Sequence, residues 1–237
     1  MKFVYLILLM MFFQIGCASK NKLEEKYPMA EISRPYTLLY GLKSWNTVLI
    51  PVENSAVVNP LIWETPLSDS FTLMWVPLPL GFKWQWLNDD THRFGVSALY
   101  LLLGITTNLD YRYKAADSWV IDINHNYLDF DTLLFRVKLS TLSAGPVFQI
   151  TDRFAVKPYL STFNGSLSAG FLTQAIVDSI FGDVSSNMTT KFNGTGSGLD
   201  LLYAFNYQWN MKMGVAVLNT NNVGSHASGS FTLTHIW

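Results

Sequence analysis

The feature of this chain that most constrains its fold is a two-residue alternation of apolar and polar side chains. It is clearest in residues 118–124, where the two kinds of side chain take successive positions. Trp119, Ile121 and Ile123 alternate there with Val120, Asp122 and Asn124. A period of two with one apolar face is typical of a β-strand whose other face meets water. We therefore expect an all-β fold.

The same alternation recurs in residues 132–139, 154–160 and 211–218, with charged side chains on the polar face. The charged residues of these stretches and of 118–124 are Asp122, Arg136, Lys138, Lys157 and Lys212. If the strands close into a barrel, we expect these five side chains to face a polar lumen. Because their charges are of both signs and side chains nearly fill a small barrel, we expect a salt-bridge network, not an ion-selective pore.

The composition suits neither a typical soluble protein nor a helical membrane protein. Only 14% of the residues are charged, whereas ordinary soluble domains have roughly 25%, and 15% are aromatic, with eight Trp. After residue 16, however, no apolar run approaches the ~20 residues of a membrane-spanning helix. The net charge of −1 gives no electrostatic argument for a nucleic-acid partner.

A closed antiparallel β-barrel reconciles these observations, because strands can cross a bilayer only when every backbone group is paired. We assign residues 44–237 to such a transmembrane barrel. At roughly 18–20 residues per strand and connection, it would have about ten strands, within a range of eight to twelve. The eight Trp residues would supply the aromatic girdles at the two membrane interfaces.

Turn-forming residues separate the predicted strands. We expect short hairpin turns at residues 88–90, 151–153 and 208–210, and long polar loops at 187–198 and 219–230. Residues 168–184 have the apolar spacing of an amphipathic helix, so we expect a short helix near 170–182 within a loop.

The last nine residues resemble the terminal strand of bacterial outer-membrane β-barrels. Apolar and aromatic residues alternate up to the final position, although His235 replaces the usual Tyr or Phe. They are Phe231, Leu233, His235 and Trp237. The resemblance implies insertion by the barrel-assembly machinery through strand Phe231–Trp237, and outer-membrane lipids as partners. A soluble periplasmic β-domain that ends in an aromatic strand is the alternative.

Residues 1–16 have the pattern of a secretory signal, with Lys2 followed by an apolar run. The Gly16-Cys17 pair behind it resembles the lipobox of bacterial lipoproteins, although Gln14 stands where Leu is usual. The resemblance implies that Cys17 is acylated and anchors the protein to the outer membrane, with residues 17–43 as a polar tether. Cys17 is the only cysteine, which excludes an intramolecular disulfide. An ordinary signal peptide that contains a cysteine is the alternative.

Catalytic and metal-binding signals are weak. The four His residues are not at metal-ligand spacing, and we expect no metal site and no cofactor. His226 and Ser228 have the His-x-Ser spacing found in outer-membrane lipid hydrolases, and residues i and i+2 of a strand share a face. The acid of a triad would have to come from another strand, for instance Asp122 or Asp200.

Three functional hypotheses follow from these patterns. The first is a lipid-anchored, non-catalytic outer-membrane barrel with a structural, adhesive or small-solute role. The second is a barrel enzyme that hydrolyses or remodels membrane lipid with His226 and Ser228. The third is a soluble periplasmic β-domain held at the membrane by Cys17 alone.

Overall fold

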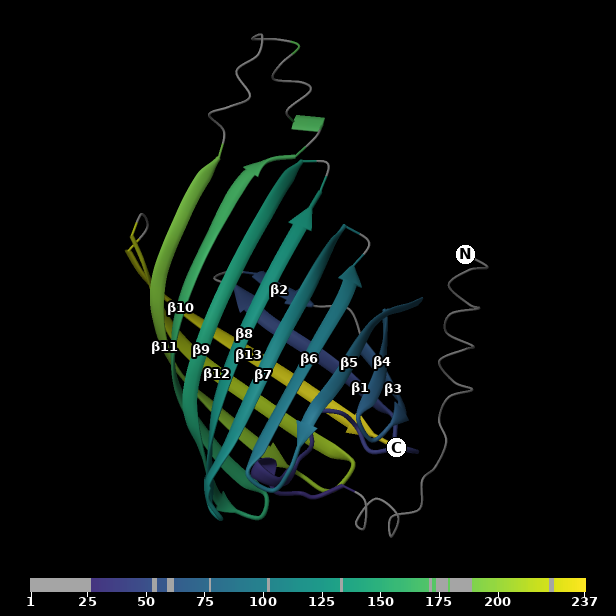
Figure 1. Ribbon diagram of the computed structural model, residues 1–237. Helices are drawn as coiled ribbons and strands as arrows, with labels where there is room; N and C mark the ends of the chain where they lie inside the picture. Colours follow the sequence, from purple (N-terminus) through teal and green to yellow (C-terminus); the bar gives the residue numbers. More distant parts are fainter. Residues whose placement is uncertain are drawn as a thin grey trace.

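The computed structural model describes residues 27–52, 55–58, 62–76, 78–101, 103–132, 134–170, 172–173, 179, 189–221 and 224–237. These residues form a short 3-10 turn, η1 (Glu31–Ser33), followed by antiparallel strands (Figure 1). The strands are β1 (Ser44–Val52), β2 (Ser55–Val58), β3 (Ile62–Ser68), β4 (Phe71–Val76), β5 (Leu78–Asn88), β6 (His92–Leu101), β7 (Gly104–Ala116), β8 (Trp119–Asp131), β9 (Phe135–Thr151), β10 (Phe154–Ala169), β11 (Thr190–Ala204), β12 (Trp209–Thr220) and β13 (Gly224–Ile236).

The strands form one closed antiparallel barrel. From β3 to β13, each strand pairs with the next along the chain, and β13 pairs with β1 to close the wall. Both β2 and β3 pair with β1: β3 with residues 44–46 at its beginning, and β2 with residues 49–52 at its end. They are therefore two segments of one wall strand. Counted in this way, the described residues make a twelve-stranded barrel. The predicted all-β antiparallel barrel is confirmed.

The sequence-based estimate of about ten strands is too low. The connections are shorter than assumed: residues 44–236 supply twelve wall strands, or about 16 residues for each strand and its connection. The predicted turns at 88–90 and 151–153 fall where β5 meets β6 and β9 meets β10, although their first residues, Asn88 and Thr151, still belong to a strand. Of the predicted turn at 208–210, Trp209 and Asn210 already belong to β12. The predicted long loops at 187–198 and 219–230 are wrong in large part, because β11 begins at Thr190 and β13 at Gly224.

The glycines of β11 explain why a loop-like composition forms a strand. A Cβ atom at Gly194 would lie 2.1 Å from the carbonyl oxygen of Asn219 and 2.6 Å from the Phe163 ring, and one at Gly198 would lie 2.4 Å from the Tyr159 ring. Glycine is therefore favoured at these positions because the backbone or a side chain of a neighbouring strand lies against them. The predicted helix near 170–182 lies mostly outside the described residues. Within it, Leu172, Thr173 and Ser179 have helical backbone.

Both described ends of the barrel wall meet at one rim. The backbone groups of Lys43 and Trp237 donate to each other's carbonyl oxygens at 2.9 Å, next to the pairing of Ser44 with Ile236. We call this end the terminal rim and the opposite end the far rim. Strands β8 to β11, with 13 to 17 residues each, form a taller wall than β3 and β4, with 7 and 6 (Figure 1).

The outer surface of the barrel is apolar and aromatic. Large apolar side chains that point outward are strongly exposed, among them Leu160 at 70%, Trp86 at 69% and Val215 at 63%. Trp rings cluster close to the terminal rim: Trp84 stacks on Trp86 with centroids 5.8 Å apart, and Trp63 meets Trp237 edge-on at 5.9 Å. An apolar belt with an aromatic girdle is the outer surface of a barrel that spans a bilayer.

Among the described residues, no helix is long and apolar enough to cross a membrane.

Candidate functional site: the barrel lumen

Residues 27–43 enter the lumen at the terminal rim and pack against the inside of the wall. Ile32 packs on Val120, Val147 and other buried side chains of β8 to β10. Farther along the segment, Leu38 and Leu42 form a second buried cluster with Ile236 and Tyr27. We call residues 27–43 the inner segment. They belong to the stretch predicted to be a polar tether, residues 17–43, and the structure corrects this because Tyr27, Leu38 and Leu42 are buried in the barrel mouth.

The backbone of the inner segment is held by polar side chains of the wall. The Gln85 side chain of β5 accepts hydrogen bonds from the amides of Tyr36 and Thr37, at 3.1 and 3.2 Å. Arg93 of β6 donates to the carbonyl oxygen of Arg34 at 2.8 Å. The Tyr36 ring lies against Gly95, where a Cβ atom would approach the ring to 2.1 Å. The wall is thus shaped to receive this segment.

Arg112 links the inner segment to a buried ion-pair cluster. Its guanidinium binds Asp122 on the neighbouring strand with Nε–Oδ1 and Nη2–Oδ2 distances of 2.6 and 3.0 Å. It also donates to the carbonyl oxygen of Glu31 at 2.8 Å. Lys157 completes the cluster, with its Nζ 3.2 Å from Asp122 Oδ2 and 3.1 Å from Asn124 Oδ1.

Arg34, a residue of the inner segment, binds other residues of that segment and one strand of the wall. It forms an ion pair with Glu31 at 3.3 Å, donates to the carbonyl oxygen of Met29 at 2.9 Å and hydrogen-bonds Asn210 of β12. Burial raises the pKa of the Tyr27 phenol, which lies beside Arg34, to about 12, so Tyr27 stays neutral at any physiological pH.

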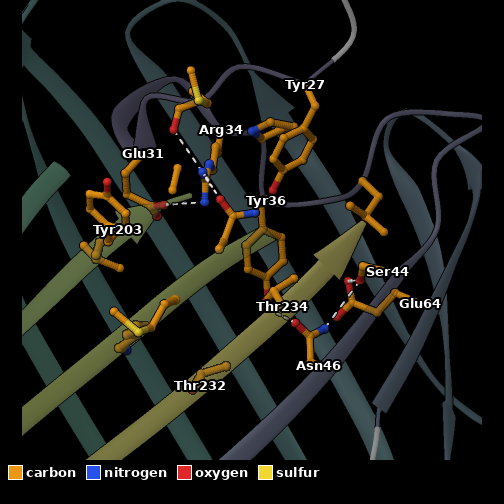
Figure 2. A pocket seen from close by; sticks show the side chains of 18 of the residues that line it. Tyr27, Glu31, Arg34, Tyr36, Ser44, Asn46, Glu64, Tyr203, Thr232 and Thr234 are labelled. Carbon is orange, nitrogen blue, oxygen red and sulfur yellow. Dashed lines mark hydrogen bonds and ion pairs between the residues drawn. The ribbon is translucent and has the colours of Figure 1, made fainter. Parts of the chain in front are cut away.

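A pocket of about 240 Å³ lies between the inner segment and the wall of β1, β11, β12 and β13. Figure 2 shows its lining, with Ser44, Asn46 and Glu64 on one side and Arg34 and Tyr36 on the other. Its wall groups bind one another: Thr234 donates to Asn46 at 2.6 Å, and Ser44 donates to Glu64 at 3.2 Å. Lys83 forms an ion pair with Glu64.

Three of the five predicted lumen residues face the lumen. Asp122 and Lys157 are joined in the Arg112 cluster, and Lys212 pairs with Asp200 at 2.9 Å. Asp200 and Lys157 are opposite one another in the ladder of β10 and β11, so the two ion pairs line the same side of the lumen.

Arg136 and Lys138 were predicted to face the lumen, and this is wrong. They pair in register with Asp131 and Asp129 of β8, on the face opposite to Asp122, and form ion pairs with them on the outer surface. Lys138 lies level with Ser166, twelve residues along β10 from Phe154. At 3.3 Å per residue and a tilt of about 40°, that is roughly 30 Å along the axis, beyond an apolar band of about 25 Å.

A second pocket, of about 320 Å³, lies in the lumen between the inner segment and the far rim. We call it the central cavity. Its lining comes from β8 to β13. The polar side chains that contribute are those of Asn124, Thr141, Ser143, Lys157, Tyr159, Ser161, Asp200, Lys212, Ser228 and Ser230, beside apolar residues of β12 such as Ala216 and Leu218. Ser161 and Asp200 are buried, and both lysines are held by carboxylates.

His226 and Ser228 lie on one face of β13, as predicted, and that face is the lumen wall. They pair with Leu218 and Ala216 of β12, which share a face with Lys212. The two carboxylates that were considered as a third catalytic group are both bound to cations, Asp122 to Arg112 and Asp200 to Lys212. This arrangement places a Ser nucleophile toward water and away from the apolar belt.

Among the residues that the structure describes, no group of three or more His, Cys, Asp or Glu side chains could hold a metal ion. The predicted lipidation site, Cys17, and the signal sequence lie outside the described residues.

The sequence-based reasoning missed the side chains that hold the inner segment, above all Arg112, Gln85 and Arg34. One signal for Arg112 was present, since it stands between Tyr111 and Tyr113 and alternation puts it on the opposite face. A second signal was the apolar and aromatic content of residues 27–42, which a solvated tether does not need.

No family model and no curated protein matches the chain. Among solved structures, it is similar to the NanC porin, with 8% identity, 82% of this chain and 98% of that chain covered, and a TM-score of 0.47. Ail, the attachment invasion locus protein of Yersinia pestis, aligns with 12% identity over 84% and 100% of the two chains and a TM-score of 0.37. OmpT, an outer membrane protein of Vibrio cholerae, aligns with 8% identity over 83% and 96% and a TM-score of 0.36. What these comparisons describe is a similarity of barrel architecture.

Proposed function

We propose that this chain is a non-catalytic barrel of the bacterial outer membrane with a small-solute role. In this proposal the lumen binds small polar solutes, and the inner segment occludes its terminal rim. The observation that carries the proposal is the polar central cavity of about 320 Å³, which adjoins a mouth filled by residues 27–43. Pockets that bind small ligands have volumes of roughly 300–1,000 Å³.

The closed wall of the barrel and its apolar outer surface support the membrane location in this proposal. A closed barrel leaves no unpaired strand edge, which is what the bilayer interior requires. Its exposed apolar belt would face lipid, and both described ends of the wall lie at the rim that carries the short turns. In outer-membrane barrels the short turns face the periplasm, which would place the far rim outside the cell.

A conductance experiment tests the occluded lumen. The full chain is reconstituted in planar lipid bilayers, and the wild-type protein is compared with Arg34→Ala, which loses the bonds to Glu31, Met29 and Asn210. We expect low conductance for the wild type and a several-fold increase for Arg34→Ala. Lys114→Ala is the matched control, because Lys114 lies close to the same rim but pairs with Asp117 of the adjoining turn. A wild-type conductance equal to that of Arg34→Ala would contradict the occlusion.

The lipid anchor at Cys17 is a second part of the proposal. If Cys17 is acylated, metabolic labelling with an alkyne-bearing palmitate analogue will mark the wild-type protein and not Cys17→Ser. An integral barrel is also expected to stay in the membrane fraction after urea washing when Cys17 is replaced. Release of Cys17→Ser by the wash would favour the soluble periplasmic domain instead.

The absence of catalysis is also part of the proposal, and hydrolysis of membrane lipid by His226 and Ser228 is the competing function. The lumen-facing position of both residues argues against lipid as the substrate. Replacement of Ser228 by Ala is therefore expected to leave the lipid profile of the cell envelope unchanged. Loss of a deacylated lipid species in that variant would overturn this part of the proposal.

A further inference from the structure

Three aromatic rings line the lumen wall of β10 and β11, each one placed over a glycine of the neighbouring strand. A Cβ atom would lie 2.4 Å from Tyr159 at Gly198, 2.6 Å from Phe163 at Gly194 and 2.5 Å from Phe192 at Gly165. The register confirms the pairs, because Tyr159 is opposite Gly198, Phe163 opposite Gly194 and Phe192 opposite Gly165. We call these three rings the aromatic strip.

The glycines set the orientation of the aromatic strip. With no Cβ beneath it, a ring can lie close against the backbone of the neighbouring strand instead of projecting across the lumen. Each of the three side chains is partly exposed. Since Tyr159 also lines the central cavity, the strip begins there, and Phe163 lies four residues farther along β10 toward the far rim.

The rest of the central cavity offers hydroxyl and amide groups. Ser143, Ser161, Ser228 and Ser230 contribute hydroxyls from three strands, and Asn124 contributes an amide. A hydroxyl can both donate and accept a hydrogen bond. Each lysine of the cavity already forms an ion pair with a carboxylate: Lys212 is 2.9 Å from Asp200, and Lys157 is 3.2 Å from Asp122.

We infer that the central cavity and the aromatic strip bind a small neutral saccharide. This inference rests on the proposed small-solute function and names its substrate class. A pyranose ring has C–H groups on its faces, which pack on the apolar face of an aromatic ring. The hydroxyls at its edge need partners that both donate and accept, as the four serines do. A ligand of this size fits a cavity of about 320 Å³.

The two ion pairs of the cavity favour a neutral saccharide over charged small solutes. A sugar acid would need a cation without a carboxylate partner, and both lysines of the cavity have one. An amino acid would have to break the Lys212–Asp200 pair to gain its own ion pairs. Breaking this pair is costly because the Asp200 side chain is buried, so its carboxylate has already lost most of its hydration.

Isothermal titration of the full chain in detergent tests this inference. The probes are maltose as a neutral saccharide, glucuronate as a sugar acid and lysine as an amino acid. We expect maltose to bind and to bind more tightly than either of the other two. For Tyr159→Ala, we expect at least a tenfold rise in the maltose Kd, and for Tyr159→Phe a change of no more than threefold. Phe148→Ala, which removes an outward-facing ring of β9, is the matched control and should leave the Kd unchanged.

The possible failures are distinguishable. Tighter binding of glucuronate or lysine overturns the saccharide class and leaves solute binding in the lumen in place. An unchanged maltose Kd in Tyr159→Ala overturns the role of the aromatic strip. If none of the three probes binds to a wild-type sample whose folding is verified by its circular dichroism, both this inference and the proposed solute function are wrong.

Discussion

Arg112 of β7 and Asp122 of β8 lie directly opposite each other in the barrel wall and form a two-point ion pair inside the lumen. Their side chains are 19% and 9% exposed. Because Arg112 also donates to the carbonyl oxygen of Glu31, one side chain joins the barrel wall to the segment that fills its mouth.

Replacing Arg112 by Ala is therefore expected to destabilise the folded barrel by about 3 kcal/mol, since it leaves a buried carboxylate with Lys157 as its remaining ion-pair partner. Urea unfolding in detergent, followed by Trp fluorescence, measures the change. Arg136→Ala is the matched control, because Arg136 pairs with Asp129 on the outer surface and is 41% exposed. Its effect should stay within about 1 kcal/mol. Equal losses in the two variants would refute the structural role of the Arg112 cluster.

Gly95 is expected to be required for the docking of the inner segment. An alanine at this position would bring its Cβ to 2.1 Å from the Tyr36 ring, so the ring must move away from the wall. Limited proteolysis of Gly95→Ala should then cut within residues 27–43 faster than in the wild type. On a Tyr36→Ala background the clash is gone, and Gly95→Ala should add little. Additive effects of the two substitutions would show that the ring and the glycine act independently.

A cation in the outward apolar belt should impair membrane insertion. Leu160 lies six residues along β10 from Phe154, roughly 15 Å along the axis and near the middle of a band about 25 Å tall. Leu160→Arg is expected to cost about 2–4 kcal/mol of stability in lipid. Leu134→Arg is the control, because Leu134 is similarly exposed but lies in the connection before β9 at the far rim. If both variants fold equally well in vesicles, the belt does not face lipid.

The turn between β5 and β6 should lose order in acid. The amides of Thr91 and His92 donate to the Asp89 carboxylate, and these bonds, that of His92 first, hold the pKa of Asp89 below its ordinary value of 3.8. A lowered pKa means that the stabilisation is present above pH 3.8 and is lost as the pH falls through the lower folded value. Hydrogen exchange of the two amides should therefore accelerate, relative to other turn amides, below that pH. In Asp89→Asn this acceleration should disappear.

The alternation in the sequence was enough to predict the barrel and its inward face where the strands cross the apolar band. Trp119, Ile121 and Ile123 do point away from the lumen that holds Asp122. The same rule failed for Arg136 and Lys138, because alternation fixes only that they share a face and not which face. Beyond the apolar band, water lies on the outside of the wall, and the polar face turns outward.

The inner segment could not be predicted from alternation at all. Its residues form no strand, and they are held by single side chains from strands far away in sequence, such as Gln85 for Thr37 and Arg112 for Glu31. Long-range contacts of this kind leave no local period. The same holds for the aromatic strip, because two of its glycines, Gly194 and Gly198, lie in a stretch with the composition of a loop and were assigned to one.

The central claim is that this chain spans the outer membrane as a closed barrel, and heat-modifiable gel migration tests it most directly. The membrane fraction is washed with urea, dissolved in dodecyl sulfate and run with and without boiling. The account predicts two positions, because a closed barrel of paired strands stays folded in the detergent until it is heated. A single position, unchanged by boiling, would contradict it.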